Sequence, residues 1–404
     1  MGMKNNSIKF ESNQFQKIQT DLKQLKSPEG FLYASNSKFK TLFGRDSLIS
    51  SWQMIGIDNT IAKNTLKILS KYQGKELNKK KEEELGKIMH EYRKNKREIL
   101  NTNLAKRTKN IILKYWDFPY YGSIDSTPLF IIILVFYYRE TKDSLFVRKL
   151  IPNLEKALNW IIYYADKNKN GFIAYQRINP HGLFHQGWKD RTYDSLHIKP
   201  PVSLVEVQGY AYKALKEGAW LYRNFIRNNK KSLLLNQNAE NLKNKFNKIF
   251  WLPDKKFYAF ALDGNNKQIK SVTSNVGHCL FTGIIDKSHE KEIVKRLFAK
   301  DIFTDYGIRT LSSEDKNFDE KGYHWGAVWP HDNWIIYKGL KASGYEKEAS
   351  MIRNAITKAY SELGFIPECY VVTKSNKIYP LKRADIVQAW SLCTIINFVH
   401  EKNF

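Results

Sequence analysis

Two short acidic motifs in this 404-residue chain carry the residue types that hydrolysis of a glycosidic bond requires. The first is Gly187-Trp188-Lys189-Asp190, in a polar and glycine-containing segment, and the second is Pro367-Glu368, far downstream among aromatic residues. In glycoside hydrolysis one carboxylic acid protonates the leaving oxygen, and a second carboxylate activates water or attacks the sugar. The chain contains 40 Asp and Glu residues in total, so two carboxylates alone prove little. The surrounding motifs are therefore needed to support this prediction.

Helical periodicity dominates the segments that must position these motifs. Helix pairs joined by alternately short and long loops indicate a toroid of helical hairpins, with functional residues on the long loops. No apolar alternation is long enough to predict a sheet domain. The predicted helices cover residues 46–55, 61–72, 127–139, 144–166, 204–228, 234–250, 289–298, 333–341, 346–363 and 385–399.

The chain is strongly basic, with 66 Lys and Arg and a net charge of +26. Such a charge is typical of proteins that bind nucleic acid or an anionic surface. Here the lysines are spread along the sequence among asparagines, and no RNA-binding, zinc-finger or helix-turn-helix pattern accompanies them. A general bias towards lysine and asparagine explains the charge better than a nucleic acid partner does.

The cysteine count and the apolar segments predict a cytoplasmic protein without membrane spans. Cys279, Cys369 and Cys393 are odd in number and widely separated, which favours a reducing compartment. The first ten residues lack the apolar core of a signal peptide, and the apolar run 128–138 is shorter than the roughly 20 residues that cross a bilayer. His324 and His331 lack an acidic partner at metal-ligand spacing, so neither a metal nor an organic cofactor is expected.

A series of motifs resembles the bacterial and archaeal amylo-α-1,6-glucosidases, the glucosidase part of glycogen debranching enzymes. This family belongs to a wider group that includes the glucoamylases, and the resemblance extends from about residue 20 to about residue 400. In chain order the motifs are LFGRDSLI (42–49), YQG (72–74), ELGKIMHE (84–91), YYGSIDSTPLF (120–130), QGWKD (186–190), EVQGY (206–210), SNVGH (274–278), YGIRTL (306–311), VWPHDN (328–333), PE (367–368) and QAW (388–390).

The resemblance implies an all-α fold, an (α/α)6 barrel, with the active site in a funnel at one end. It implies a single catalytic domain over residues 1–404, without the N-terminal β-sandwich domain that many relatives carry. It also implies inversion of the anomeric configuration, with Asp190 as general acid and Glu368 as general base, about 6.5–9.5 Å apart. A general acid must be protonated near neutral pH, so Trp188 is expected to shield Asp190, and Lys189 to point away from it.

The resemblance also assigns residues to substrate binding, and several assignments have structural alternatives. Arg45 and Asp46 resemble a pair that grips sugar hydroxyls through charge-assisted hydrogen bonds, although Asp46 also suits a helix start. Asp125 is equally suited to a sugar contact and to a buried network, and Asp332 to a helix cap. Gln208 is favoured as a sugar contact over Glu206. The full set is Arg45, Asp46, Tyr120, Asp125, Trp188, Lys189, Gln208, Trp329, His331, Asp332 and Trp390, the last as the pocket floor.

Departures from the family pattern cluster around the two predicted catalytic residues. Cys369-Tyr370 replaces the usual Leu-Phe after Glu368, Arg191 replaces a serine after Asp190, and Trp325 replaces a small residue. These changes indicate an altered pocket on the aglycone side.

The leading hypothesis is therefore an exo-acting, inverting α-glucosidase that hydrolyses α-1,6 bonds, or other α bonds, of branched glucans or their oligosaccharides. The first alternative keeps the fold and the chemistry for a small solute, such as a glucosyl- or mannosyl-glycerate or a disaccharide. The second alternative is a non-catalytic protein that binds carbohydrate or nucleic acid. The sequence does not predict an oligomeric state.

Overall fold

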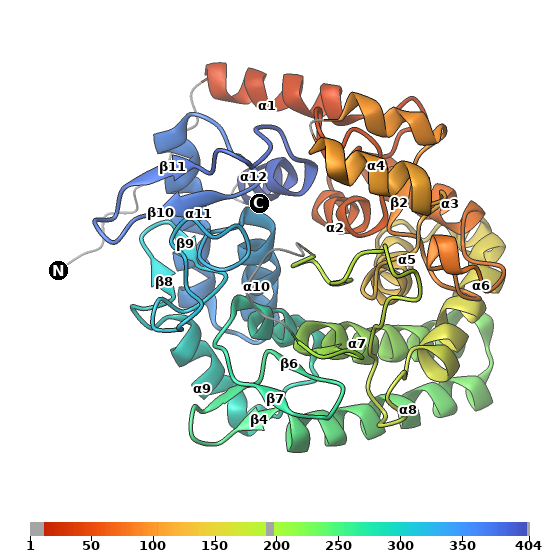
Figure 1. Cartoon of the computed structure of the whole chain (residues 1–404). Helices are drawn as coiled ribbons and strands as arrows, with labels where there is room; N and C mark the ends of the chain where they lie inside the picture. The colour runs from red at the N-terminus through yellow and green to blue at the C-terminus, as the bar shows by residue number, and fades with distance from the viewer. Residues whose placement is uncertain (1–11, 103, 191–197, 402–404) are drawn as a thin grey trace.

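Helices form two concentric rings in the computed structural model, which describes residues 12–102, 104–190 and 198–401 (Figure 1). Each inner element packs against the next one along the chain, and the last returns to the first, so the inner ring is closed. The inner elements are α2 (Gly44–Met54), α5 (Ser126–Thr141), α7 (Val205–Leu221), the 3-10 helix η5 (Ser274–Thr282), α10 (Pro330–Ala342) and α12 (Ala389–His400).

The outer ring alternates with the inner ring along the chain. Each outer helix from α3 onward packs on an inner element next to it in the chain, whereas the first, α1, packs on the last inner helix, α12. Along the described part of the chain, the elements of the two rings alternate, beginning with the outer helix α1 and ending with the inner helix α12. This alternation is an (α/α)6 barrel, as predicted. The outer helices are α1 (Ser12–Leu25), α3 (Asn59–Lys71), α6 (Ser144–Asn159), α8 (Asn229–Ile249), α9 (Lys287–Leu297) and α11 (Glu346–Leu363).

The hydrophobic patterns of the two rings explain their positions. Every residue of α2 and η5 is buried, as is the apolar run of α5 from Leu129 to Val135, which is typical of a helix enclosed on all sides. The outer helix α3 instead buries one stripe, formed by Ile61, Ala62, Thr65, Leu66 and Leu69, and exposes its other face.

A glycine permits close approach within the inner ring. A Cβ atom at Gly339 of α10 would lie 2.6 Å from Leu280 Cβ and 2.8 Å from the backbone nitrogen of Phe281, both in η5. No real Cβ atom tolerates contacts this short, so α10 and η5 pack backbone against backbone only because residue 339 lacks a side chain.

All ten predicted helices are present, with differences at their ends. The C-terminal helix α12 begins at Ala389, four residues later than predicted, because residues 385–388 belong to the loop that enters the pocket. Residues 160–164 and 222–226, predicted as α-helix, are π-helical continuations of α6 and α7, named η3 (Trp160–Tyr164) and η4 (Tyr222–Ile226).

Five helical elements of the described residues were not predicted. They are α1, α4 (Lys106–Tyr115), η5 and the short 3-10 helices η1 (Lys79–Lys81) and η2 (Lys96–Asn101). The sequence of η5 opens with Ser, Asn, Val and Gly, all of which have low helix propensity, so only its burial between α7 and α10 explains its conformation.

The strands are short antiparallel pairs within the loops, consistent with the absence of a predicted sheet domain. Each pair fixes the path of a loop and contributes little to the core. The pairs are β1 (Leu42–Phe43) with β2 (Glu91–Tyr92), β4 (Trp251–Leu252) with β5 (Phe257–Tyr258), β8 (Phe303–Thr304) with β9 (Gly307–Ile308) and β10 (Tyr370–Val372) with β11 (Ile378–Pro380); β6 (Ala261–Leu262) pairs with both β3 (Ser203–Leu204) and β7 (Gln268–Ile269).

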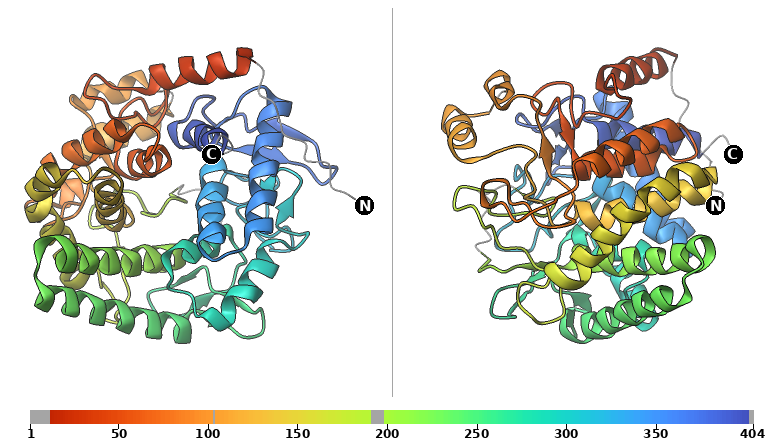
Figure 2. Two further views of the ribbon diagram at one scale, coloured as in Figure 1. Left: turned by 180° about the vertical axis from the view of Figure 1, so that it is seen from behind. Right: turned by 90° about the vertical axis from the view of Figure 1, so that its right-hand side faces the viewer.

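One helical segment lies outside the alternating rings. The 3-10 helix η2 (Lys96–Asn101) and α4 follow β2 and precede α5, and they stand out from the barrel in the side view (Figure 2). Their apolar residues join a separate small cluster, formed by Ile99, Ile112, Trp116 and Tyr120. This insertion forms a wall beside the site described below.

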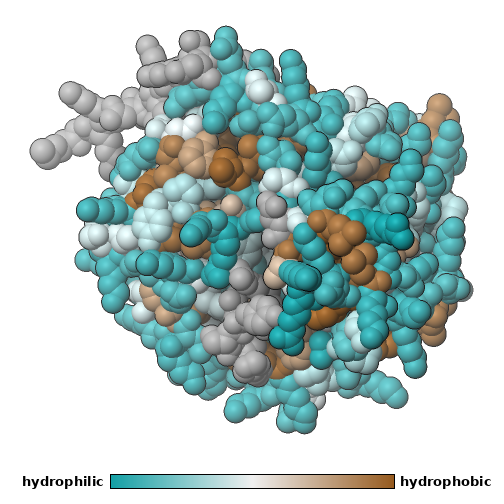
Figure 3. Space-filling model, turned by 45° about the horizontal axis from the view of Figure 1, so that its top comes forward, coloured by the Kyte–Doolittle hydropathy of each residue, from teal (hydrophilic) through white to brown (hydrophobic). Residues whose placement is uncertain are grey.

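The surface and the cysteines complete the description of the fold. The face in Figure 3 is largely hydrophilic, with hydrophobic side chains in separate patches. None of the helices in the described part of the chain is both long and apolar enough to span a membrane. Cys279, Cys369 and Cys393 are all buried and form no disulfide bond.

Candidate active site

One pocket contains both predicted catalytic carboxylates. Three inner helices present their first turns to it: α2 contributes Arg45 and Asp46, and α10 and α12 contribute the residues at their starts. Long loops between the rings supply the remaining side chains. The lining residues are Phe39, Phe43, Arg45, Asp46, His90, Trp188, Asp190, Tyr323, His324, Trp329, Glu368, Gln388 and Trp390.

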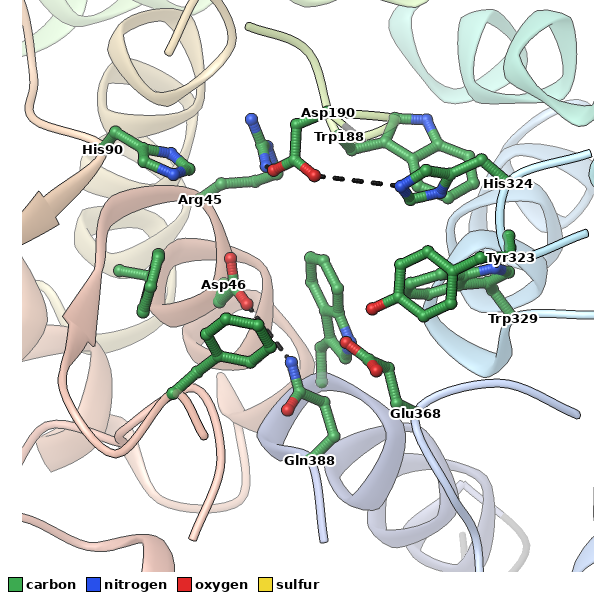
Figure 4. A pocket seen from close by; sticks show the side chains of 13 residues that line it. Arg45, Asp46, His90, Trp188, Asp190, Tyr323, His324, Trp329, Glu368 and Gln388 are labelled. Atoms are coloured by element: carbon green, nitrogen blue, oxygen red, sulfur yellow. Dashed lines mark hydrogen bonds and ion pairs between the residues drawn. The ribbon is translucent and has the colours of Figure 1, made fainter. Parts of the chain in front are cut away.

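Asp190 and Glu368 lie on opposite sides of this pocket (Figure 4). The Asp190 side chain is 31% exposed, with one oxygen 3.3 Å from Arg45 Nη1 and the other 3.8 Å from His324 Nε2. Glu368 is only 2% exposed. Its Oε2 accepts a hydrogen bond from the backbone N–H of Asp385 at 3.2 Å, and the Tyr323 hydroxyl also hydrogen-bonds to this carboxyl.

The two carboxyls have opposite protonation tendencies. Burial would raise the pKa of Asp190, but the hydrogen bond from His324 and the charge of Arg45 outweigh it and lower the pKa to about 2. Burial raises the pKa of Glu368 to about 8, against the hydrogen bond from Tyr323. In this geometry Asp190 is ionised and Glu368 is protonated at neutral pH. A general acid at Asp190 was expected to be protonated, and the cations beside it explain the difference.

Arg45 is held in place by a buried ion pair. Its Nε lies 2.7 Å from Asp125 Oδ2, and its Nη2 donates to the carbonyl oxygen of Gln186 at 3.3 Å. Asp125 also accepts a hydrogen bond from Ser123 Oγ at 2.7 Å and does not line the pocket. Of its two expected roles, the structure therefore shows the buried network, which orients Arg45 towards Asp190.

Asp46 lies in the pocket beside Arg45. Its Oδ1 accepts a hydrogen bond from Gln388 Nε2 at 3.4 Å, and burial raises the pKa of Asp46 to about 7. A charged donor and a carboxyl that both face the cavity suit the recognition of neighbouring sugar hydroxyls.

Indole rings form much of the pocket wall. Trp188 and Trp329 pack edge to face, with ring centroids 5.6 Å apart, and Trp390 stacks on the imidazole of His331 at 3.8 Å. The indole nitrogens of Trp188 and Trp390 are buried and have no hydrogen-bond partner among the described protein groups. His331 does not itself line the pocket and supports Trp390 from behind.

Lys189 and Gln208, predicted to bind substrate, have other partners. The Lys189 ammonium donates to the carbonyl oxygen of Thr310 at 2.8 Å and lies 5.0 Å from the ring of Trp325, so it points away from the pocket. Gln208 donates both amide hydrogens to backbone oxygens, those of Ile173 and Leu204. Neither side chain lines the cavity, so the structure does not bring them together with the other predicted sugar contacts.

Asp332 belongs to a buried chain of polar groups outside the lining of the pocket. Its Oδ1 lies 2.7 Å from His278 Nε2, and the other ring nitrogen of His278 lies 2.6 Å from the Tyr210 hydroxyl. Asp332 does not line the pocket, and the start of α10 has no side-chain cap. Glu206 is also buried, and no ion pair is found for it among the described residues.

Tyr120 also lies outside the lining of the pocket. Its hydroxyl accepts a hydrogen bond from the backbone N–H of Leu183 at 2.8 Å, and its ring stacks on Trp116 at 3.8 Å. It therefore anchors the neighbouring insertion. Arg191, whose presence after Asp190 departs from the family pattern, lies outside the described residues.

Six lining residues were not assigned to the site from the sequence: Phe39, Phe43, His90, Tyr323, His324 and Gln388. Phe43, His90 and Gln388 fall inside quoted motifs, so their positions were a usable signal. His324 was considered only as a metal ligand, and in the structure it faces Asp190.

The fold and the site together define the class of protein: a glycoside hydrolase built on an (α/α)6 barrel. The family model described as "Mannosylglycerate hydrolase MGH1-like glycoside hydrolase domain" matches residues 46–374. The chain therefore belongs to the MGH1-like glycoside hydrolase family. The match is to this family and not specifically to the amylo-α-1,6-glucosidases, whose motifs the sequence resembles.

Solved structures of the same fold come from Thermus thermophilus. An uncharacterized conserved protein matches with a TM-score of 0.71 and 14% identity, over 96% of this chain and 99% of that chain. A GH63 mannosylglycerate hydrolase in complex with Tris and D-glycerate matches with a TM-score of 0.70 and 14% identity, over 96% and 100%. The same enzyme in complex with glucose matches with a TM-score of 0.70 and 15% identity, over 95% and 99%. No curated protein sequence matches.

Proposed function

We propose that this protein is an inverting hydrolase of α-glycosides in which one sugar is linked to an anionic, non-sugar aglycone, with glycosyl-glycerates as the simplest examples. The observation that carries the proposal is the pocket itself, with Asp190 and Glu368 on its opposite sides. Opposed carboxyls suit an attack by water from the side remote from the leaving group.

In the proposed reaction Asp190 protonates the glycosidic oxygen, and Glu368 takes a proton from the attacking water. Asp190 suits the first role because it also lines a second chamber, which Glu368 does not reach and where a leaving group would lie. Glu368 suits the second because it lies on the opposite side of the pocket, remote from that chamber.

The protonation states must exchange when substrate binds, because Asp190 is ionised in this site. We propose that sugar hydroxyls take over the interactions that Arg45 and His324 make with Asp190. This exchange raises the pKa of Asp190, and the proton of Glu368 passes to it through the bound hydroxyls or water.

Positively charged residues in the second chamber, next to Asp190, support an anionic aglycone. Arg93 and Arg177 line the second chamber, and the family model is named for hydrolases of mannosylglycerate. The motif resemblance to amylo-α-1,6-glucosidases favours a second candidate, the release of glucose from α-1,6 branch stubs of glucans.

Turnover measurements separate these candidates. We expect α-glucosyl- or α-mannosyl-glycerate to be hydrolysed with a kcat/KM at least about tenfold above that of panose or a branched limit dextrin. The reverse order would establish the glucan activity instead. Absence of hydrolysis for all four compounds would contradict both candidates and leave the non-catalytic binding hypothesis.

A further inference from the structure

A second chamber opens directly from the sugar pocket. It shares Phe39, Phe43, His90 and Asp190 with that pocket and has a volume of about 380 Å³. Because Asp190 belongs to both cavities, a group attached to the oxygen that Asp190 protonates extends into this chamber.

The insertion outside the helical rings forms one wall of the chamber. On this side the chamber is lined by Leu104, by the α4 residues Thr108, Ile111 and Ile112, and by Trp116, which comes directly after α4. The loop on the facing side lines the chamber with Pro180 and Leu183. With Phe39 and Phe43, most of the chamber wall is therefore apolar.

Hydrogen bonds hold the two walls together. Trp116 Nε1 donates to the carbonyl oxygen of His181 at 2.8 Å, and the rings of Tyr115 and His181 stack at 3.6 Å. The facing loop is also fixed from behind, because Glu82 accepts hydrogen bonds from the backbone N–H groups of Ile178 and Asn179. The chamber is a built cavity whose two sides are tied to each other.

The two carboxylates of the chamber lining, Glu91 and Asp190, are both paired with other cations, which leaves one arginine of the lining over. Buried Arg93 is paired with Glu91, its Nε 2.5 Å from Glu91 Oε1, and Asp190 is paired with Arg45. Arg177 is exposed, and no ion pair is found for it among the described residues; one of its Nη atoms bonds to the carbonyl oxygen of Gly182 at 3.3 Å. Arg177 therefore remains available to an anionic group.

We infer that the natural substrate carries an amphipathic aglycone, with an apolar body of several carbon atoms against α4 and a carboxylate near Arg177. Glycerate is a three-carbon acid with no apolar body, whereas ligand pockets of about 300–1,000 Å³ hold drug-sized molecules. This inference rests on the proposed function and specifies its leaving group.

The chemistry is ordinary hydrolysis. The bond between the anomeric carbon and the aglycone oxygen breaks, and its electron pair goes to that oxygen, which takes the proton of Asp190. Water supplies the new bond to the anomeric carbon and loses its proton to Glu368. The products are the free sugar and a hydroxyl-bearing apolar carboxylate.

A series of substrates tests the inference separately from the proposed function. For each of glucose and mannose, kcat/KM is measured for the α-glycosyl fluoride, the glycosyl-glycerate, the hexyl glycoside and the carboxyhexyl glycoside. Hydrolysis of a fluoride tests the site without an aglycone. We expect the carboxyhexyl glycoside to exceed the glycerate at least about 30-fold, because each buried methylene contributes roughly fourfold. Its kcat/KM should also exceed that of the hexyl glycoside at least about fivefold, because only the carboxyhexyl group has a carboxylate to pair with Arg177.

Two substitutions locate the effect. In Ile111→Ser the ratio of kcat/KM for the carboxyhexyl glycoside to that for the glycerate falls at least fivefold, and Arg177→Gln abolishes the preference for carboxyhexyl over hexyl. Leu100→Ser, at a side chain 51% exposed outside the chamber, and Arg107→Gln, at an exposed position on α4, keep the wild-type ratios.

The outcomes are distinct. Hydrolysis of a fluoride with no preference for the carboxyhexyl glycoside over the glycerate overturns the inference and leaves the proposed function standing. No hydrolysis of either fluoride overturns the proposed function. Unchanged ratios in both chamber variants also overturn the inference, because the preference then arises elsewhere.

Discussion

At the scale of single residues, Asp190 and Glu368 differ in their surroundings more than in their chemistry. Asp190 faces Arg45 and His324, whereas Glu368 is buried beside Tyr323. The sequence predicted both carboxyls, because each lies in a short motif. It did not predict their protonation, since His324 and Tyr323 come from a loop more than a hundred residues after Asp190.

The general acid and the general base are distinguished by two amide substitutions. Both Asp190→Asn and Glu368→Gln lower kcat on a glycosyl-glycerate by about 10²–10⁴-fold. On a glycosyl fluoride, whose leaving group needs little protonation, Asp190→Asn keeps most of its activity and Glu368→Gln does not. Activity retained by Glu368→Gln instead would reverse the two roles. Asp254→Asn, at an exposed position, is the matched control.

The pKa of Glu368 predicts a pH-dependent stability. Its folded-state value of about 8 exceeds the usual 4.5, so between these two pH values the unfolded chain releases a proton that the folded protein keeps. Stability contributed by the protonated carboxyl is therefore lost as pH rises through this window. Glu368→Gln cannot ionise, so the variant does not lose this stability as pH rises. The difference between its melting temperature and that of the wild type is expected to increase from pH 4.5 to pH 8 and to level off above pH 8.

Asp190 predicts the opposite trend. Its folded-state pKa of about 2 lies below the usual 3.8, so the ionised carboxylate stabilises the fold above pH 3.8, and this contribution disappears as pH falls through about 2. Asp190→Asn is expected to melt below wild type at pH 7, and the deficit should shrink near pH 2–3. Parallel curves for the two variants would contradict the pKa values of both groups.

At the scale of elements, periodicity was sufficient where a helix has its own stripe of apolar residues. The outer helix α3 was predicted within two residues at each end. Periodicity could not identify η5, because all nine of its residues are buried and its conformation depends on neighbours from distant segments. The insertion with α4 was likewise missed, because its apolar residues pack in a small cluster apart from the core.

The contact between α10 and η5 predicts a strong effect of one methyl group. Gly339→Ala places a Cβ atom against the backbone of Phe281 and is expected to destabilise the fold by about 1–3 kcal/mol, as overpacking does. Gly218→Ala in α7 is the matched control, because its Cβ would meet only side chains, those of Leu158 and Leu235, at 3.0–3.5 Å. Chemical denaturation measures both, and equal stabilities would contradict the packing of the inner ring.

At the scale of the whole molecule, the net charge of +26 acts on stability. Like charges spread over one surface repel, and salt screens them. Raising KCl from about 50 to about 500 mM is expected to raise the melting temperature by a few degrees. A variant with Lys75, Lys230 and Lys316 changed to Glu has a less positive net charge and should respond less. A melting temperature that falls with salt would show that specific ion pairs dominate instead.

The barrel itself was predictable from the sequence as a whole, because the helix pairs and the ordered motifs pointed to the same architecture. The substrate was not. The motifs describe the sugar pocket, which related enzymes share, whereas the second chamber depends on the insertion with α4 and on the loop that carries Arg177. None of the motifs quoted from the sequence covers α4 or Arg177.

The stereochemistry of the product tests the central claim most directly. Proton NMR of an α-glycosyl-glycerate digest, recorded in the first minutes before the sugar equilibrates, identifies the anomer that is released. The opposed carboxyls of Asp190 and Glu368 predict that the β anomer appears first. Initial release of the α anomer would contradict the inverting site, and no release from any α-glycoside, the fluorides included, would contradict the assignment of the pocket as a hydrolase site.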